Sequence, residues 1–425
     1  LVDSSSTGKK LAEALIQKAK EGIEVRVMVD AVTLYYYLLQ KHKIRGMNDL
    51  ETLKKLAQSP GVETRMLDAI HEEVQPSYVI GNHRKILLVD DKWMLTGGRN
   101  ISDRYFTTNG FHYHDAGVLL RGSFGDSTSV LCQRLWEHAR DVKSLFGLAS
   151  QETTTKSESD ETMEVSLPEE DRSTISNMSI TEDLAIDLEF AEEGRALGID
   201  TSACEGTDHR TSQEEVVESN VAVFQLDHQG GNKDGYDITF STLLYLIETA
   251  EERIDLVMGY FQLFPEMEAA IVRAIARGVM VRLATNSDLT NGLTGANATF
   301  GGALERCLEA GVEVYVTADL AEYKEEGAFC LHYKLAVFDQ RVALVGSWNC
   351  IGASVFHDSD YSVVLFDQRS GPRDKYMFQP IEDLIDEGIR VGRMVRLESV
   401  AEDSFQVPVY FYPLSSKYGR RQMKQ

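Results

Sequence analysis

The stretch HRKILLVDDKWMLTGGRN, residues 83–100, is matched in pattern by HYKLAVFDQRVALVGSWN at residues 332–349. Both stretches place a histidine, a lysine, an aspartate, a glycine-led pair and an asparagine at the same offsets. The matching positions are His83, Lys85, Asp90, Gly97, Gly98 and Asn100 in the first copy, and His332, Lys334, Asp339, Gly346, Ser347 and Asn349 in the second. This many polar residues at fixed offsets indicate one active site assembled from two related halves.

The similarity extends outward from the two stretches. In each half an amphipathic helix, at residues 11–19 and 267–276, ends before a glycine, Gly22 or Gly278, and a β-branched strand follows. Glycine just past a helix readily adopts the left-handed conformation that turns the chain toward the strand. Helices that alternate with short strands predict an α/β fold of two tandem α-β-α sandwich halves, related by pseudo-twofold symmetry and sharing one active site.

One predicted strand has no counterpart. The second half begins with an apolar strand at residues 254–261, and nothing in the first half matches it. Because the chain opens on Leu1 in what reads as a strand end, we expect the matching first strand to lie upstream of this sequence and to border the site.

Net charge is distributed unevenly along the 425-residue chain. Residues 151–220 carry 16 of the 24 net negative charges and a single aromatic residue, so they cannot bury enough apolar surface to offset their ordering entropy. We expect, in order, an N-terminal half at 1–148, an acidic disordered linker at 149–220 with a short helix at 181–197, a C-terminal half at 221–398 and a tail at 399–425. A partner-binding linker is the alternative to a solvated one.

Strand geometry assigns roles within each copy. Residues two apart on a strand share a face, so His83 and Lys85 should project together, as should His332 and Lys334. Asp90 and Asp339 have the opposite parity and fall in turns, where we expect them to brace the strand end. The small residues and asparagines that follow suit an oxyanion, so we expect a phosphate-binding set consisting of Gly98, Asn100, Ser347 and Asn349.

Two histidines beside two lysines suit phosphodiester chemistry. One imidazole can attack phosphorus while the other, protonated, donates to the leaving oxygen, and the ammonium groups stabilise the charge that develops. Each histidine then requires a carboxylate behind it to set its protonation state. Asp115, 32 residues after His83, and Asp360, 28 residues after His332, are the candidates, and we expect each to serve the histidine of its own half.

The two elements resemble the phospholipase D superfamily, and the resemblance covers both halves. It implies metal-independent cleavage without a cofactor, a phosphohistidine intermediate, His83 as nucleophile and His332 as general acid and then base. The segment from Gly97 through Phe106 is similar to the bacterial cardiolipin synthase branch, related to phosphatidylserine synthases. The second half departs from that branch, with Asp360 where glutamate is common.

This resemblance implies a phospholipase D-type phosphodiesterase or phosphatidyltransferase that acts on phospholipids such as phosphatidylglycerol. We expect a monomer peripheral to a bacterial membrane, on its cytoplasmic side, with an upstream signal or anchor left open. The alternatives are a nuclease using the same pocket, which the acidic balance disfavours, and a catalytically silent scaffold of the same fold.

Four further features are less specific. The aromatic and basic run at residues 35–45 could seat on anionic lipid or form a half-buried helix. His112 and His114 are two residues apart, a spacing that would let both bind one metal ion from the same face of a strand. We interpret them instead as loop histidines near the pocket, and we expect no metal site. Ser354 could donate to phosphate or hold the pocket wall. Five scattered cysteines without a CxxC pair indicate reduced thiols rather than a zinc site or a disulfide framework.

Overall fold

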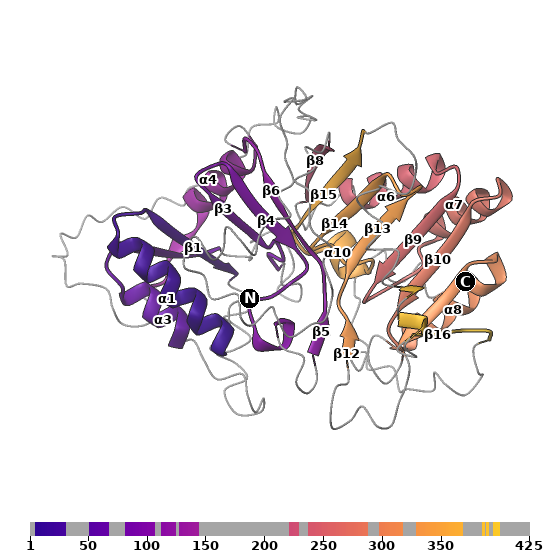
Figure 1. Cartoon of the computed structure of the whole chain (residues 1–425), viewed down its shortest axis with the longest axis horizontal. Helices are drawn as coiled ribbons and strands as arrows, with labels where there is room; N and C mark the ends of the chain where they lie inside the picture. Colours follow the sequence, from indigo (N-terminus) through magenta and orange to yellow (C-terminus); the bar gives the residue numbers. More distant parts are fainter. Residues whose placement is uncertain are drawn as a thin grey trace, which may run out of the picture.

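A computed structural model shows two α/β halves side by side, the first in indigo to magenta and the second in pink to yellow (Figure 1). The structure describes residues 5–30, 51–67, 81–106, 112–124, 127–143, 221–228, 237–287, 297–317, 329–368, 385–386, 388–390 and 394–399. The expected linker at 149–220 with its helix at 181–197, nearly all of the tail at 399–425 and the whole run at 35–45 lie outside these residues.

The elements of the two halves follow the predicted alternation. The first half contains α1 (Ser6–Lys20), β1 (Val25–Asp30), α3 (Glu51–Gln58), β2 (Val62–Leu67), β3 (Ile86–Val89), β4 (Trp93–Gly97), η1 (Asp103–Tyr105), β5 (His112–His114), β6 (Gly117–Arg121), α4 (Thr128–His138) and β7 (Arg140–Asp141). The second half contains β8 (Val221–His228), α6 (Ile238–Thr249), β9 (Arg253–Met258), α7 (Pro265–Ala276), β10 (Met280–Thr285), α8 (Asn297–Ala310), β11 (Glu313–Thr317), β12 (Phe329–Leu331), β13 (Lys334–Phe338), β14 (Val342–Gly346), α10 (Gly352–Phe356), β15 (Asp360–Asp367) and β16 (Met394–Arg396).

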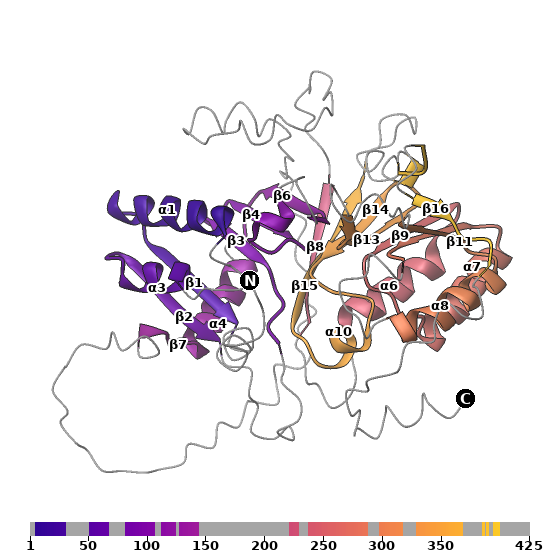
Figure 2. The same cartoon turned by 90° about the horizontal axis from the view of Figure 1, so that it is seen from below.

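The second half is organised around one eight-stranded sheet in the order β16-β11-β10-β9-β13-β14-β15-β8. β9 lies near its middle, parallel to β10 and antiparallel to β13. Helices α6, α7 and α8 lie along one face of this sheet (Figure 2). Their apolar stripes bury Leu243, Ile247, Met267 and Ile271 against the strands, which forms the larger hydrophobic core.

The first half repeats this arrangement in two pieces. One sheet has the order β1-β2-β7 and the other β3-β4-β6. These strands correspond to β10-β11-β16 and β13-β14-β15, and the described part of the first half contains no strand equivalent to β9. Among described residues, the two pieces are therefore separate sheets where the second half has one.

The halves pack sheet against sheet. Met94, Leu120 and Phe124 of the first half form one buried cluster with residues such as Val345 and Val363 of the second. Polar contacts flank this cluster: the Thr128 hydroxyl lies 2.9 Å from the Tyr361 hydroxyl, and the Arg84 guanidinium pairs with Asp227. The interface therefore combines a hydrophobic centre with buried polar contacts.

Two strand-like crossings also join the halves. β5 pairs in parallel with β12, and Asn82 forms an isolated parallel bridge with Ser359. Each crossing brings the residues just before a histidine of the repeated pattern beside the residues just before a carboxylate of the opposite half. This exchange positions the site described below.

No helix within the described ranges is both long and apolar enough to cross a membrane. The four cysteines that the structure describes, Cys132, Cys307, Cys330 and Cys350, are free thiols.

Candidate active site

The two histidines are held by backbone bonds to the opposite half. The His83 amide donates to the Ser359 carbonyl (2.8 Å), and the His332 amide donates to the His114 carbonyl (2.7 Å). Both histidines directly precede strands of the repeated pattern, β3 and β13. The crossings thus fix each histidine against the opposite half.

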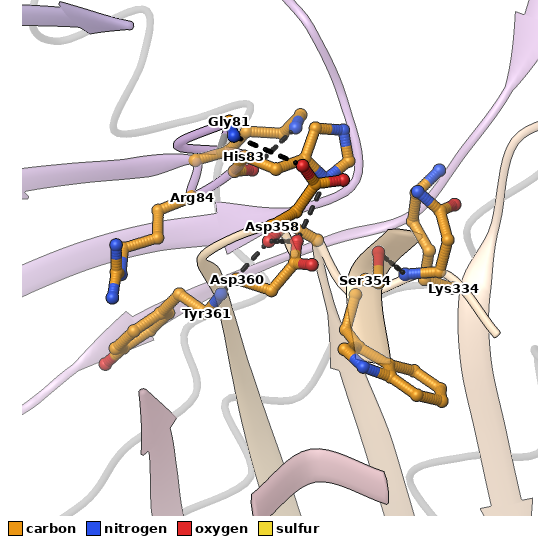
Figure 3. Close-up of polar contacts among 12 residues, drawn as sticks. Gly81, His83, Arg84, Lys334, Ser354, Asp358, Asp360 and Tyr361 are labelled. Carbon is orange, nitrogen blue, oxygen red and sulfur yellow. Dashed lines mark hydrogen bonds and ion pairs between the residues drawn. The ribbon is translucent and has the colours of Figure 1, made fainter. Parts of the chain in front are cut away.

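Each histidine takes its carboxylate from the other half. His83 Nδ1 contacts Asp360 Oδ1 (Figure 3) at a distance of 2.9 Å, and His332 Nδ1 lies 2.6 Å from Asp115 Oδ2. The expectation that each acid serves the histidine of its own half is therefore wrong. The physical reason is the pairing across the interface, which places the start of β15 beside the start of β3, and the end of β5 beside the end of β12.

The two lysines lie buried beside the histidines. The Lys85 ammonium donates to the His83 carbonyl (2.8 Å), and Lys334 Nζ lies 2.7 Å from His332 Nδ1. Burial lowers the pKa of Lys85 to about 8 and that of Lys334 to about 7, despite the carboxylates nearby. Both amines therefore titrate near neutral pH.

Both imidazoles favour the neutral form. Burial, followed by the Lys85 charge, lowers the pKa of His83, and burial with Lys334 and Lys85 lowers the pKa of His332 further. Because Lys85 acts on His332 and Lys334 acts on His83, the four side chains belong to one electrostatic site. A neutral imidazole that donates from Nδ1 to a carboxylate keeps a free lone pair on Nε2.

The two carboxylates differ in character. Burial raises the pKa of Asp115 to about 6. Burial acts in the same direction on Asp360, but His83, Ser347 and Lys85 together lower its pKa to about 2. Asp360 is therefore firmly ionised behind His83, whereas Asp115 holds its charge less firmly behind His332.

The small residues of the pattern contact these acids. The Ser347 hydroxyl donates to Asp360 Oδ1 (2.7 Å) and accepts from the Tyr361 amide (3.0 Å). At the matching position, a Cβ on Gly98 would lie 2.4 Å from Asp115 Oδ1. Both residues were expected to bind phosphate, but the structure places them behind the histidines, where they pack against the carboxylates.

The two asparagines are placed differently. Asn100 donates from Nδ2 to the Tyr105 hydroxyl (2.9 Å). Asn349 is buried, and its Oδ1 has no hydrogen-bond partner among the described residues. Its backbone amide donates to the Ser354 hydroxyl (3.2 Å), so Ser354 holds the wall of the site at this point.

The turn aspartates lie away from the histidines. Asp90 and Asp339 both have left-handed backbone conformations, with φ of 52° and 49°. The Asp339 carboxylate accepts from the amides of Glu251, Glu252 and Arg253 (2.8–2.9 Å) at the start of β9. This carboxylate fixes the end of β13 to β9, the arrangement that the strand parity predicts.

Sequence reasoning missed several residues around the histidines. Tyr105, Tyr113 and Tyr260 surround the His332 ring, with centroid distances of 5.2, 5.3 and 5.7 Å. On the other side, Asp358 accepts from the Gly81 amide (3.3 Å), and burial, with the nearby Asp360 charge, raises its pKa to about 7. One signal was present in the sequence, because Tyr105 and Ser354 both follow their asparagine by five residues.

The pair His112 and His114 lies on β5, with the two Nε2 atoms 3.0 Å apart. His114 supplies the carbonyl that holds His332, so this strand serves the site through its backbone. Within the described residues, no group of three or more histidine, cysteine or acidic side chains is arranged to hold a metal ion.

Comparison with known proteins places this geometry in a family. A family model described as "Cardiolipin synthase, PLD-like domain" matches residues 2–113 and 243–384, which is more than half of the chain. A cardiolipin synthase of Clostridium perfringens is 31% identical over 121 residues, 28% of this chain and 23% of that protein. Cardiolipin synthase C of Escherichia coli is 21% identical over 378 residues, 84% of this chain and 73% of that protein.

The crystal structure of phosphatidylserine synthase from Haemophilus influenzae has the same fold, with a TM-score of 0.59 at 12% identity over all of this chain and 87% of that one. The chain spans only about a quarter of the length of the first curated relatives that it matches. The match in both halves, together with the paired histidines and lysines, shows that the chain belongs to the phospholipase D superfamily, in its cardiolipin synthase-like branch.

Proposed function

We propose that this protein is a phospholipase D-type phosphodiesterase and phosphatidyltransferase that acts on phospholipids through a phosphohistidine intermediate. The observation that carries the proposal is the crossed pair of histidines, each bonded through Nδ1 to a carboxylate of the opposite half. This arrangement leaves both Nε2 atoms available for chemistry beside two buried amines. The names of the relatives support a phospholipid as substrate.

In the first step, His83 Nε2 attacks the phosphorus of the diester, and the bond to the alcohol oxygen breaks. His332 supplies the proton that this oxygen takes up. In the second step, an incoming hydroxyl gives its proton to His332 while its oxygen bonds to phosphorus and the N–P bond breaks. Water as acceptor yields phosphatidic acid, and an alcohol such as phosphatidylglycerol yields a new diester.

The electrostatics of the site suit this division of roles. His83 is the more accessible histidine, with 29% of its side chain exposed against 8% for His332, and its low pKa keeps the attacking nitrogen unprotonated. An arriving diester adds a negative charge next to His332, which raises the pKa of that imidazole toward the value an acid needs. The two lysines, when protonated, stabilise the phosphoryl oxygens as charge develops.

The substrate implies contact with a membrane surface. A diester that is part of a bilayer lipid must reach histidines held between two protein halves, so we propose a peripheral association on the bacterial membrane. The chain acts in this proposal as a monomer, because both histidines and both acids come from one copy.

The test uses the full chain with vesicles that contain phosphatidylglycerol labelled in its glycerol head group. We expect released glycerol with phosphatidic acid, or a new diester, and loss of at least about 10³-fold in His83→Ala and His332→Ala. His138→Ala is the matched control, because His138 is an exposed histidine on α4 that hydrogen-bonds the Arg134 carbonyl of its own helix.

Two readouts decide between mechanisms. A quench with denaturing detergent at neutral pH, where an N–P bond survives, of a reaction with bis(4-nitrophenyl) phosphate should trap the nitrophenyl phosphate group on the chain in His332→Ala but not in His83→Ala, because nitrophenolate leaves without an acid. A parallel reaction with single-stranded DNA tests the nuclease alternative. Cleavage of DNA without turnover of lipid, or lipid turnover that survives both histidine substitutions, would refute the proposal.

A further inference from the structure

The Tyr105 hydroxyl lies at the reactive nitrogen of His332. Its oxygen is 3.4 Å from His332 Nε2 and accepts from Asn100 Nδ2 at 2.9 Å. We propose that Tyr105 relays the proton between His332 and the alcohol oxygen that leaves or enters at phosphorus. This inference rests on the proposed function, since it assigns a residue to the proton transfer of that reaction.

The phenol is held in place from two directions. The Tyr105 ring stacks on Tyr113 with a centroid distance of 4.8 Å and meets the His332 ring edge-on at 85°. Tyr105 ends the short helix η1, whose first residue, Asp103, accepts from the Thr7 amide (2.7 Å) and the Thr7 hydroxyl (2.7 Å) at the start of α1. These contacts hold the Tyr105 hydroxyl beside His332 Nε2.

Among the residues that the structure describes, no hydroxyl takes the equivalent position beside the opposite histidine, His83. Ser354 stands five residues after Asn349, as Tyr105 stands five residues after Asn100. The Ser354 hydroxyl accepts from the Asn349 amide instead of reaching a histidine. His83, the proposed nucleophile, is also more exposed than His332, so the phenol covers the acid–base histidine and leaves the attacking one open.

The hydrogen-bonding capacity of a phenol fits a relay. A tyrosine hydroxyl accepts two hydrogen bonds and donates one. Asn100 fills one acceptor position. Protonated His332 Nε2 fills the other, which leaves the phenol proton for the leaving oxygen.

The protons balance in both steps. As the P–O bond breaks, the leaving oxygen takes the proton of Tyr105, and Tyr105 takes the proton of His332 Nε2. When an acceptor attacks, its hydroxyl proton passes to the Tyr105 oxygen, the phenol proton returns to His332 Nε2, and the N–P bond breaks as O–P forms. Burial raises the pKa of Tyr105, so the phenol stays neutral before and after each transfer.

The test uses the full chain, the variant Tyr105→Phe and the soluble diester bis(4-nitrophenyl) phosphate. Nitrophenolate leaves without help from an acid, so the first step should proceed at a rate within about threefold of wild type. The second step needs a base for water, so steady turnover should fall roughly 10²-fold. Tyr105→Phe should therefore release about one nitrophenolate per chain in a burst and then slow, as His332→Ala should also do.

Tyr113→Phe is the matched comparison, because it removes a neighbouring phenol oxygen that hydrogen-bonds Arg104 and keeps the ring stack. Any effect of this change should fall equally on burst and steady rates. An equal fall of both rates in Tyr105→Phe, or no fall in either, overturns the relay. Wild-type turnover of the soluble diester without turnover of lipid overturns only the lipid assignment, and absence of both overturns the mechanism and the relay together.

Discussion

Lys85 and Lys334 are basic residues of the site whose charge changes near neutral pH. In most proteins a lysine stays protonated well beyond pH 9. Here burial lowers the two pKa values to about 8 and about 7. In the proposed reaction their ammonium forms attract the diester anion, so substrate capture would depend on protons that these side chains hold only weakly.

We therefore expect kcat/KM for an anionic diester to fall as pH rises through 7 and 8, since that ratio reports the free enzyme. The stability contribution has the opposite sign. With folded pKa values below the ordinary 10.5, the unfolded chain binds more protons above about pH 7, so these lysines make the free energy of unfolding rise with pH.

Measurement of kcat/KM and of the melting temperature from pH 6 to pH 9 checks this prediction. Lys334→Met should remove the pH transition near 7 along with most of the activity. Lys55→Met, on the exposed face of α3, should retain the activity and both pH transitions. A kcat/KM value that stays constant to pH 9 contradicts the assignment.

At the scale of elements, the crossed strands decide which acid serves which histidine. Asp115 follows β5, which pairs with β12 just before His332, and Asp360 begins β15 beside the bridge that precedes His83. Position along the chain therefore misassigns the partner of each acid. Kinetics can distinguish the two pairings because the two histidines have different roles in the proposed reaction.

With bis(4-nitrophenyl) phosphate, whose leaving group needs no acid, we expect Asp115→Asn to behave as a weaker His332→Ala: the phosphohistidine forms and then persists. Asp360→Asn should instead slow formation of the adduct, as His83→Ala does. Each change should cost roughly 10²-fold or more, because the imidazole loses the carboxylate that fixes its orientation and tautomer. Adduct formation and decay after rapid mixing measure the two effects, and the reverse assignment would indicate pairing within each half.

Much of this architecture could be predicted from element patterns. The two His-x-Lys copies, the helices that end at Gly22 and Gly278, and the unmatched strand that became β9 all follow from local periodicity and spacing. The crossings could not be predicted, because β12 and β5 have three residues each and their pairing depends on docking of the halves. The positions of Ser347, Asn100 and Tyr105 around the histidines depend on the same docking.

At the scale of the whole molecule, the two halves share a buried interface. Its centre is apolar, with Leu120 and Val363 fully buried, and Arg84 is bound to Asp227 and to the His228 carbonyl across it. Because these contacts join residues on both sides of the covalent connection between residues 143 and 221, we expect them to hold the halves together after that connection is cut.

A cut within residues 149–220 should therefore leave an associated and active two-piece protein. Insertion of a specific protease site in that segment, followed by size exclusion and the lipid assay, measures this. We expect one peak of unchanged size and activity within about twofold of the uncut chain. Separation into two peaks, or loss of activity in an intact complex, contradicts this account of the interface.

The exchange of carboxylates between halves also bears on how the protein becomes active during folding. Each half can form its helices and most of its strand pairs from contacts close in sequence, whereas the two histidine–carboxylate contacts span 277 and 217 residues. Contacts so distant form late, since the chain must first pay the entropy of closing a long loop. In refolding from denaturant, recovery of enzymatic turnover should therefore lag behind recovery of secondary structure, and catalysis itself becomes the reporter of final assembly.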